Sequence, residues 1–296
     1  MDDGRRVSAL MRRIQTVHAM RSWSRGLQRE GVTIGLVPTM GALHEGHRSL
    51  IRAARLACDA SAVSIFVNPL QFGPLEDFDR YPRSLAQDLR LCQSAGVDAV
   101  FIPRAQEMYP PDFETAVSVQ RLTRRYEGLS RPGHFGGVTT VVMKLLNIVR
   151  PDKAFFGQKD YQQAVAVERL SKDLNLDTEI VVRPTVRELD GLALSSRNRH
   201  LSPEERKAAT VLYRALSDGR ELIRAGERSV KKVEAAMTRL TRAEPLARLD
   251  YLAVVDPITL DEVRSVRGRV VLLLAVWIGE TRLIDNLIVT ARRGLQ

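Results

Sequence analysis

The sequence predicts an α/β protein in which a mostly parallel sheet with helices on both faces precedes a smaller α+β domain. The first 185 or so residues alternate short β-rich runs with helical stretches, which is typical of parallel sheets covered by helices. After that point the order changes to helices followed by strands. The chain has 296 residues, more than one compact core usually contains. We therefore expect domains at residues 1–185 and 186–296.

The first domain is predicted to hold five strands, each an apolar run that ends at turn residues. They span residues 33–38, 62–68, 99–103, 154–157 and 179–186. The helical stretches between them span residues 46–60, 84–95, 138–149 and 160–174. Ligands of such sheets bind at the carboxyl ends of the strands, so the turns after these runs are the places to search for a site.

The second domain is predicted to open with a helix capped by Ser202, with Pro203 at its first position and Glu205 at its third. The apolar periodicity predicts that this helix continues to about Ala225 and that another spans 230–242. Strands are expected over 249–255, 270–278 and 283–289. The longest apolar run of the chain is 270–278, which is too short to cross a bilayer and predicts a buried strand.

Composition limits the classes of partner. The formal net charge is +10, yet the basic residues are spread along the chain and aromatic residues make up only 5%. A surface for stacking nucleic-acid bases is therefore not expected. The first residues lack the apolar stretch of a signal peptide, so we expect a cytoplasmic protein with no membrane partner. Cys58 and Cys92 lack metal-ligand spacing and are expected to be reduced core thiols.

The most informative segment follows the first predicted strand and reads P-T-M-G-A-L-H-E-G-H over residues 38–47. Gly41 and Gly46 permit a tight turn and a close approach of the backbone to a ligand. The helix that opens near Gly46 presents N–H groups that suit a phosphate. His44 and His47 add side-chain donors. The segment therefore predicts a nucleotide site that stabilises charge as the α-phosphate is attacked.

Two other interpretations of the histidine pair stay open at this point. The pair could be surface histidines without a ligand, or two ligands of a zinc ion. The zinc interpretation lacks the H-E-x-x-H spacing and a third ligand nearby. The sequence contains no G-x-x-x-x-G-K-[ST] and no G-x-G-x-x-G, so P-loop and dinucleotide-binding sites are weakly supported.

Uncharged polar residues gather in two further segments. Asn68 and Gln71 follow the second strand, where amide side chains bind hydroxyls and carboxylates, although Asn68-Pro69 is equally typical of a turn cap. The segment R-P-G-H-F-G-G at 131–137 is either a mobile gate or the start of a helix.

Two cationic segments complete the set. Lys159, in F-G-Q-K-D-Y-Q-Q after the fourth strand, suits a phosphate, although a solvated lysine would look the same. The segment S-S-R-N at 195–198 suits a polyphosphate or, alternatively, leads into the cap at Ser202. Together the segments predict that strand ends converge on an anionic ligand.

Taken in order, these motifs resemble the pantothenate synthetase family. The resemblance is carried by P-T-M-G-A-L-H-E-G-H, S-I-F-V-N-P-L-Q-F, Y-P-R, R-P-G-H-F-x-G-V, F-G-Q-K-D-Y-Q-Q and L-S-S-R-N, and continues more loosely through T-R-L-I-D-N at 281–286. It implies a nucleotidyltransferase-type Rossmann-like domain, a C-terminal lid domain and a homodimer. It also implies ATP-dependent joining of pantoate to β-alanine through a pantoyl-adenylate, with Mg²⁺ present.

The resemblance also assigns site residues. Those implied to bind ATP are Met40, Gly41, Ala42, Leu43, His44, Glu45, Gly46, His47, Gly157, Gln158, Lys159, Asp160, Val186, Leu194, Ser195, Ser196 and Arg197. Those implied to be catalytic are His47, His44, Lys159, Ser195, Ser196 and Arg197. Gln71 and Gln163 are implied to bind pantoate or β-alanine, and Asp88 to help hold Mg²⁺.

The sequence departs from the family at two flanking positions, and two rival functions remain. Leu194 stands where the family usually has Met, and Leu70 where Thr is common. One rival is a related nucleotidyltransferase that makes a dinucleotide, which would not explain Gln71, Gln163 or R-P-G-H-F. The other is a non-enzymatic nucleic-acid-binding protein, suggested only by the net charge.

Overall fold

The chain folds into two compact units. Unit 1 comprises Met1–Gly157 and Gln162–Pro184, and unit 2 comprises Gln158–Tyr161 and Thr185–Gln296. The computed structural model describes residues 10–74 and 78–291, so the first residues, on which the expected location was based, lie outside it. None of the helices formed by the described residues is long and apolar enough to cross a membrane.

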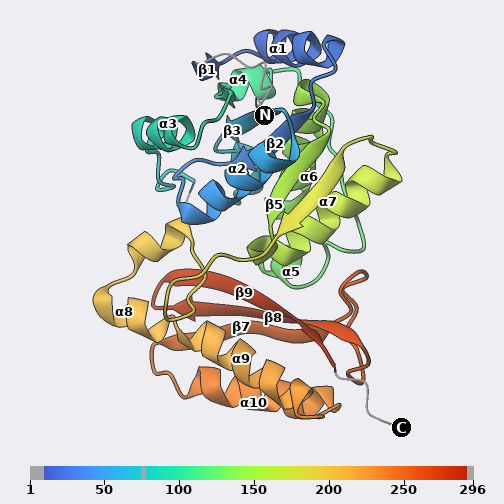
Figure 1. Ribbon diagram of the computed structural model, residues 1–296. Coiled ribbons are helices and arrows are strands. Elements are labelled where there is room, and N and C mark those ends of the chain that lie inside the picture. Colours follow the sequence, from blue (N-terminus) through green and yellow to red (C-terminus); the bar gives the residue numbers. More distant parts are fainter. Residues whose placement is uncertain (1–9, 75–77, 292–296) are drawn as a thin grey trace, which may run out of the picture. The chain divides into compact units, whose positions relative to one another are not determined.

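Unit 1 is built on a six-stranded sheet in the order β1-β4-β3-β2-β5-β6, with every pairing parallel (Figure 1). The strands are β1 (Arg12–Ile14), β2 (Ile34–Thr39), β3 (Ala60–Ile65), β4 (Ala99–Phe101), β5 (Lys153–Gly157) and β6 (Glu179–Arg183). The predicted parallel sheet is confirmed, and its five predicted strands are present. β1 was not predicted, because its three residues, R-R-I, carry no apolar run.

Helices cover both faces of this sheet. They are α1 (Val17–Arg29), α2 (Glu45–Ala57), α3 (Leu85–Ser94), α4 (Ala105–Met108), α5 (Glu127–Ser130), α6 (His134–Val149) and α7 (Tyr161–Asp173). Residues of α1, α6 and α7 share one core cluster with Leu36, whereas residues of α2 and α3 share another with Val37. Consecutive residues of β2 thus point to opposite faces, as in any strand, and both faces are apolar because both are covered.

The connections of the sheet diverge at β2 and β5, which are neighbours in it. From β2 the chain runs through α2 to β3 on one side, and from β5 it runs through α7 to β6 on the other. In open α/β sheets, ligands bind outside the carboxyl ends of the strands at such a point. The topology therefore singles out the segments that leave β2 and β5.

The segment 131–137 contains the start of α6. The helix begins at His134, earlier than predicted, and Gly133 precedes it in a left-handed conformation (φ 84°). A glycine adopts this conformation without strain. The prediction that this segment leads into a helix is confirmed, and the mobile gate stays a prediction.

Unit 2 contains a three-stranded antiparallel sheet in the order β7-β8-β9. Its elements are α8 (Pro203–Ala208), α9 (Val211–Arg224), α10 (Val230–Arg242), β7 (Ala247–Val255), β8 (Arg269–Ile278) and β9 (Thr281–Thr290). Helices α9 and α10 pack on the sheet through a core that includes Leu216, Met237 and Leu272 (Figure 1). The predicted α+β arrangement is confirmed, and β8 is its buried central strand.

The single helix predicted from Ser202 to about Ala225 is wrong. The capping box at Ser202 is present, but α8 ends at Ala208 and α9 begins at Val211. Thr210 lies at the break and donates its Oγ1–H to Lys207 O (2.8 Å), while its N–H bonds the same carbonyl (3.3 Å). A hydroxyl that engages a nearby carbonyl competes with the helical hydrogen-bond ladder.

Candidate active site

The turn after β2 is held by contacts rather than by local backbone preference. Thr39 donates its Oγ1–H to Ser64 O (2.8 Å) and accepts from Gly41 N (3.1 Å). Gly41 (φ 86°) and Ala42 (φ 51°) both adopt left-handed conformations. Glycine does so freely, whereas alanine is strained there by about 1 kcal/mol. Surrounding groups must therefore hold Ala42 in place.

Asp88, on α3, supplies those contacts. The residue is 2% exposed. Its Oδ2 accepts from Ala42 N (3.0 Å) and its Oδ1 from Leu43 N (2.8 Å) and Ser84 Oγ (3.3 Å). Both oxygens thus accept hydrogen bonds from the turn, and the expected role of Asp88 as a Mg²⁺ ligand stays a prediction. Among the described residues, no group of three or more His, Cys, Asp or Glu side chains could hold a metal ion.

His44 and His47 lie in the first turn of α2 and hold its N-terminus together. His44 is the N-cap, and its Nδ1 accepts from Gly46 N (3.2 Å), while His47 Nδ1 accepts from His44 N (3.3 Å). The ring centroids are 4.2 Å apart. Because each Nδ1 accepts an N–H, the proton of each neutral ring lies on Nε2. Both rings therefore present Nε2–H donors beside a helix N-terminus, which favours an anion.

A buried polar network orients Gln71 at the carboxyl end of β3. Asn68 Nδ2 donates to Gln71 Oε1 (3.0 Å) and to Gly137 O (3.0 Å), and Tyr109 Oη donates to Asn68 Oδ1 (2.8 Å). Burial raises the pKa of Tyr109, which keeps its hydroxyl a donor. Since the Gln71 oxygen is engaged by Asn68, its NH₂ group is the end that can donate to a ligand.

Asn68 also has the capping role that its sequence allows. Its Oδ1 accepts from Leu70 N (3.3 Å) at the start of the short helix η1 (Pro69–Gln71). α6 packs closely on η1, because a Cβ on Gly137 would come 1.9 Å from Leu70 O. His134 Nδ1 donates to Gln71 O (2.8 Å). The main chain and the side chain of Gln71 are thus both fixed.

The two consecutive glutamines of α7 differ in their surroundings. Gln162 is 4% exposed, accepts from Glu127 N (3.0 Å), and donates to the carbonyls of Leu122 and Arg125 (both 2.8 Å). Gln163 is half-buried, and its side chain makes no hydrogen bond within the described ranges. Gln162 is therefore a structural tie, whereas the amide of Gln163 can serve a ligand.

Unit 2 brings two of the predicted ATP-binding segments into one hairpin. Leu194 N donates to Val186 O (3.0 Å), and Arg187 pairs with Ala193 in an antiparallel bridge. Ser195 follows directly and caps the short helix η3 (Ser196–His200) by accepting from Arg197 N (3.3 Å). The S-S-R segment is therefore a capped turn at the end of the hairpin.

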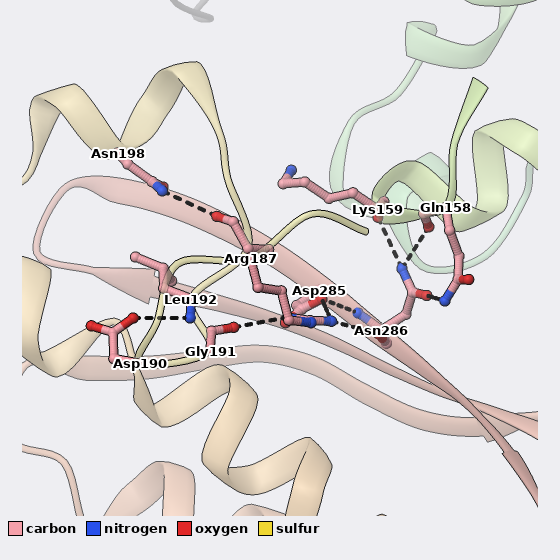
Figure 2. A network of polar contacts seen from close by, with 10 residues as sticks. Gln158, Lys159, Arg187, Asp190, Gly191, Leu192, Asn198, Asp285 and Asn286 are labelled. Carbon is pink, nitrogen blue, oxygen red and sulfur yellow. Dashed lines mark hydrogen bonds and ion pairs between the residues drawn. The ribbon is translucent and has the colours of Figure 1, made fainter. Parts of the chain in front are cut away.

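Lys159 is the cation of the other predicted segment in unit 2. It lies in the short helix η2 (Gln158–Asp160), its side chain is 20% exposed, and its Nζ is 4.0 Å from Asp160 Oδ1. Figure 2 shows its side chain extending away from Asn286, which contacts the main chain of the same turn.

Sequence reasoning assigned no role to Tyr109 or Asn286. Tyr109 stands in no motif, so only the fold reveals that its hydroxyl meets Asn68. Asn286 ends the motif T-R-L-I-D-N, and this polar pair within an apolar strand was the available signal.

A parallel sheet that carries a glycine-containing, histidine-bearing turn at the point where its connections diverge defines an α/β nucleotide-binding enzyme. The family model described as pantoate-beta-alanine ligase matches residues 12–288. The chain belongs to this family.

Similar proteins agree with this membership over nearly the full chain. Proteins named pantothenate synthetase from Heliobacterium modesticaldum and Moorella thermoacetica are 57% and 56% identical, and each match covers 94% of this chain and 99% or 98% of the relative. The crystal structure of the Thermus thermophilus pantothenate synthetase superposes with a TM-score of 0.90 at 50% identity, covering 94% of this chain and 99% of that one. The crystal structure of the Francisella tularensis pantoate-beta-alanine ligase, described as complexed with beta-gamma ATP and β-alanine, has a TM-score of 0.78 at 35% identity. The match covers 94% of this chain and 98% of that one.

Proposed function

We propose that this chain condenses pantoate with β-alanine, using ATP and releasing AMP and pyrophosphate through a pantoyl-adenylate. The observation that carries the proposal is the pair of Nε2–H donors at the N-terminus of α2, next to the strand end where the sheet connections diverge. Family membership supplies the substrates.

In the first half-reaction, a carboxylate oxygen of pantoate attacks the α-phosphorus of ATP. A P–O bond forms, and the bond to the bridging oxygen breaks as pyrophosphate leaves. His44 and His47 donate their Nε2–H groups to phosphate oxygens, and Lys159 and Arg197 neutralise the triphosphate. Such preorganised donors act mainly by stabilising developing charge and by positioning.

The remaining assigned residues hold the reactants. The backbone from Met40 to Leu43 and the segment from Gly157 to Asp160 bind ATP, together with Glu45, Gly46, Val186, Leu194, Ser195 and Ser196. Gln71 and Gln163 bind pantoate or β-alanine, and the donor end of the Gln71 amide suits a carboxylate or hydroxyl oxygen.

In the second half-reaction, the neutral amine of β-alanine attacks the acyl carbon of the bound adenylate. A C–N bond forms, the C–O bond to AMP breaks, and the amine loses a proton. We assign no residue as the base for that proton. A closed site protects the adenylate from water until the amine arrives.

The family resemblance implies Mg²⁺ and a homodimer, and we also propose a cytoplasmic location. Mg²⁺ bound to the triphosphate would neutralise phosphate charge. We propose that it arrives with ATP, because the Asp88 oxygens already serve the turn after β2. Light scattering measures the mass of the purified protein in solution, and a dimer would have twice the mass of one chain.

The test is an AMP-release assay with ATP, Mg²⁺ and pantoate, with and without β-alanine. AMP and pantothenate that appear only with all components support the proposal. A dinucleotide product would favour the related nucleotidyltransferase instead. If folded protein turns over nothing, the proposal fails, and salt-dependent binding of nucleic acid is measured next.

A further inference from the structure

Asn286, on β9, uses every hydrogen-bonding atom of its amide to hold the turn that contains Lys159. Its Nδ2 donates to the carbonyls of Gln158 (2.8 Å) and Lys159 (2.9 Å), and its Oδ1 accepts from Gln158 Nε2 (3.1 Å) (Figure 2). The residue is 1% exposed. A buried amide is costly unless its hydrogen bonds are made, and here they are all made to one turn.

The residue before it holds the hairpin that leads to Ser195. Asp285 is 4% exposed and accepts hydrogen bonds from Nη1 and Nη2 of Arg187 (2.6 and 2.9 Å). Its Oδ1 also accepts from Asn286 N (2.7 Å). Arg187 donates further to Gly191 O (3.1 Å) and Asn286 O (3.2 Å). A bidentate pair of this kind fixes direction as well as distance.

The hairpin is shaped around the same pair. Gly191 (φ 90°) is its turn glycine, and a Cβ there would come 2.0 Å from the Tyr213 ring, over which the Arg187 guanidinium lies at 4.6 Å. Two adjacent residues of one strand thus fix two segments that lie far apart in the sequence. Both segments belong to unit 2.

We propose that Asn286, with Asp285 and Arg187, is a positioning residue for adenylate formation. It sets the main chain at Lys159, while the Asp285–Arg187 pair sets the base of the Ser195–Arg197 segment, so one strand fixes the spacing between the two groups that bind the triphosphate. The inference rests on the proposed function. Misplacing a catalytic group by about 1 Å can cost on the order of 10²-fold in rate.

The test is Asn286→Asp, which is nearly isosteric but replaces the donor of two hydrogen bonds by an acceptor facing two carbonyls. We expect the rate of adenylate formation to fall by roughly 10- to 100-fold and the KM for ATP to rise. The KM for β-alanine should stay within about twofold, because β-alanine does not contact this turn in the proposed mechanism. A loss of folded protein alone would lower the total rate but leave both KM values unchanged.

Asp250→Asn is the matched control. It removes the carboxylate that pairs with Arg282 (2.6 Å) between β7 and β9 of the same sheet, away from the Lys159 turn. We expect Asp250→Asn to lose about as much thermal stability as Asn286→Asp, but to keep a near-normal rate and KM for ATP. Arg187→Lys keeps the charge but loses the bidentate geometry. It replaces Asn286→Asp as the test variant if Asn286→Asp does not fold.

Wild-type protein assayed in parallel separates the two proposals. If the wild type makes no pantothenate, the proposed function fails. If the wild type is active and Asn286→Asp, or Arg187→Lys in its place, matches it in rate and in KM for ATP, the function stands and the positioning role is overturned. The positioning role is also overturned if Asp250→Asn raises the KM for ATP as much as Asn286→Asp does.

Discussion

In the proposed mechanism, each of the two imidazoles at the start of α2 has a structural and a chemical task. Nδ1 of each ring accepts a backbone N–H and closes the first turn of the helix. The same bonds place the proton of the neutral ring on Nε2. Each ring is thus oriented by the helix that it caps, which explains why two histidines three positions apart give one fixed pair of donors.

We expect His47→Ala to lower adenylate formation by at least ~10²-fold, because it removes a donor to the phosphate oxygens. The measurement is pantoate-dependent exchange of pyrophosphate into ATP. His18→Ala is the control, since His18 is an exposed histidine on α1 in the same unit. Near-normal exchange by folded His47→Ala would remove His47 from the mechanism.

His44 allows its capping and its chemistry to be separated. Asn is a good N-cap, whereas Ala is not, so His44→Ala should be less stable than His44→Asn by about 1 kcal/mol. Both variants lose the imidazole and should lose a similar factor in adenylate formation. Urea unfolding and pyrophosphate exchange measure the two effects. Activity retained in His44→Asn but not in His44→Ala would mean that capping is the only role of His44.

At the scale of residues, the sequence predicts which side chains carry the chemistry, but it does not reveal which contacts orient them. The histidine pair and Gln71 stand in recognisable motifs. Asp88 was expected at a metal, yet its oxygens bond the amides of Ala42 and Leu43. That contact joins positions 45 and 46 residues apart, and only the pairing of strands and helices brings them together.

At the scale of elements, the turn between β2 and α2 depends on α3. The carboxylate of Asp88 is the acceptor for two successive amides of a turn that holds an alanine at positive φ. In Asp88→Asn, one amide would face an NH₂ group and lose its acceptor. We expect about 1–3 kcal/mol less stability, as for a buried donor left without its bond.

The same variant should also lower adenylate formation, since the turn carries His44 and His47. Thermal unfolding and pyrophosphate exchange, with Asp79→Asn as an exposed control before α3, measure both effects. If Asp88→Asn keeps its stability but requires more Mg²⁺, the carboxylate serves the metal after all.

The order of most elements was predictable because strand and helix periodicities are strong in this chain, although α1, α4 and α5 were not predicted. Two failures, at β1 and at the break after α8, come from contacts that periodicity does not reveal. The three residues of β1 form a strand by pairing with β4, which no periodicity reveals. The break between α8 and α9 follows from the Thr210 hydroxyl, whose competing bond interrupts an otherwise continuous apolar face.

At the scale of the whole molecule, folding keeps the thiols of Cys58 and Cys92 neutral at alkaline pH, where free thiols ionise. Burial, followed by the charge of Asp88, raises the pKa of Cys92 from 9.0 to about 12, and burial is also the largest cause that raises the pKa of Cys58 to about 11. An unfolded chain ionises these thiols first. Their contribution to stability is therefore complete below about pH 9 and is lost as the pH rises toward 11 to 12.

We therefore expect the free energy of unfolding to fall above pH 9 and to fall less steeply in Cys92→Ala. Urea unfolding of both proteins at pH 7.5, 9 and 10 measures the difference. Tyrosines and lysines titrate in the same range, but their effect on the free energy of unfolding is common to both proteins and cancels in the comparison. Parallel curves for wild type and Cys92→Ala would contradict the assignment.

Residues Gln158–Tyr161 belong to unit 2, although the residues on either side of them belong to unit 1. This interruption limits how the two units can be exchanged between related genes. A gene segment that encodes residues 185–296 lacks the turn whose carbonyls Asn286 binds. Neither unit is one continuous stretch of chain. Recombination at a single junction therefore cannot exchange one unit intact.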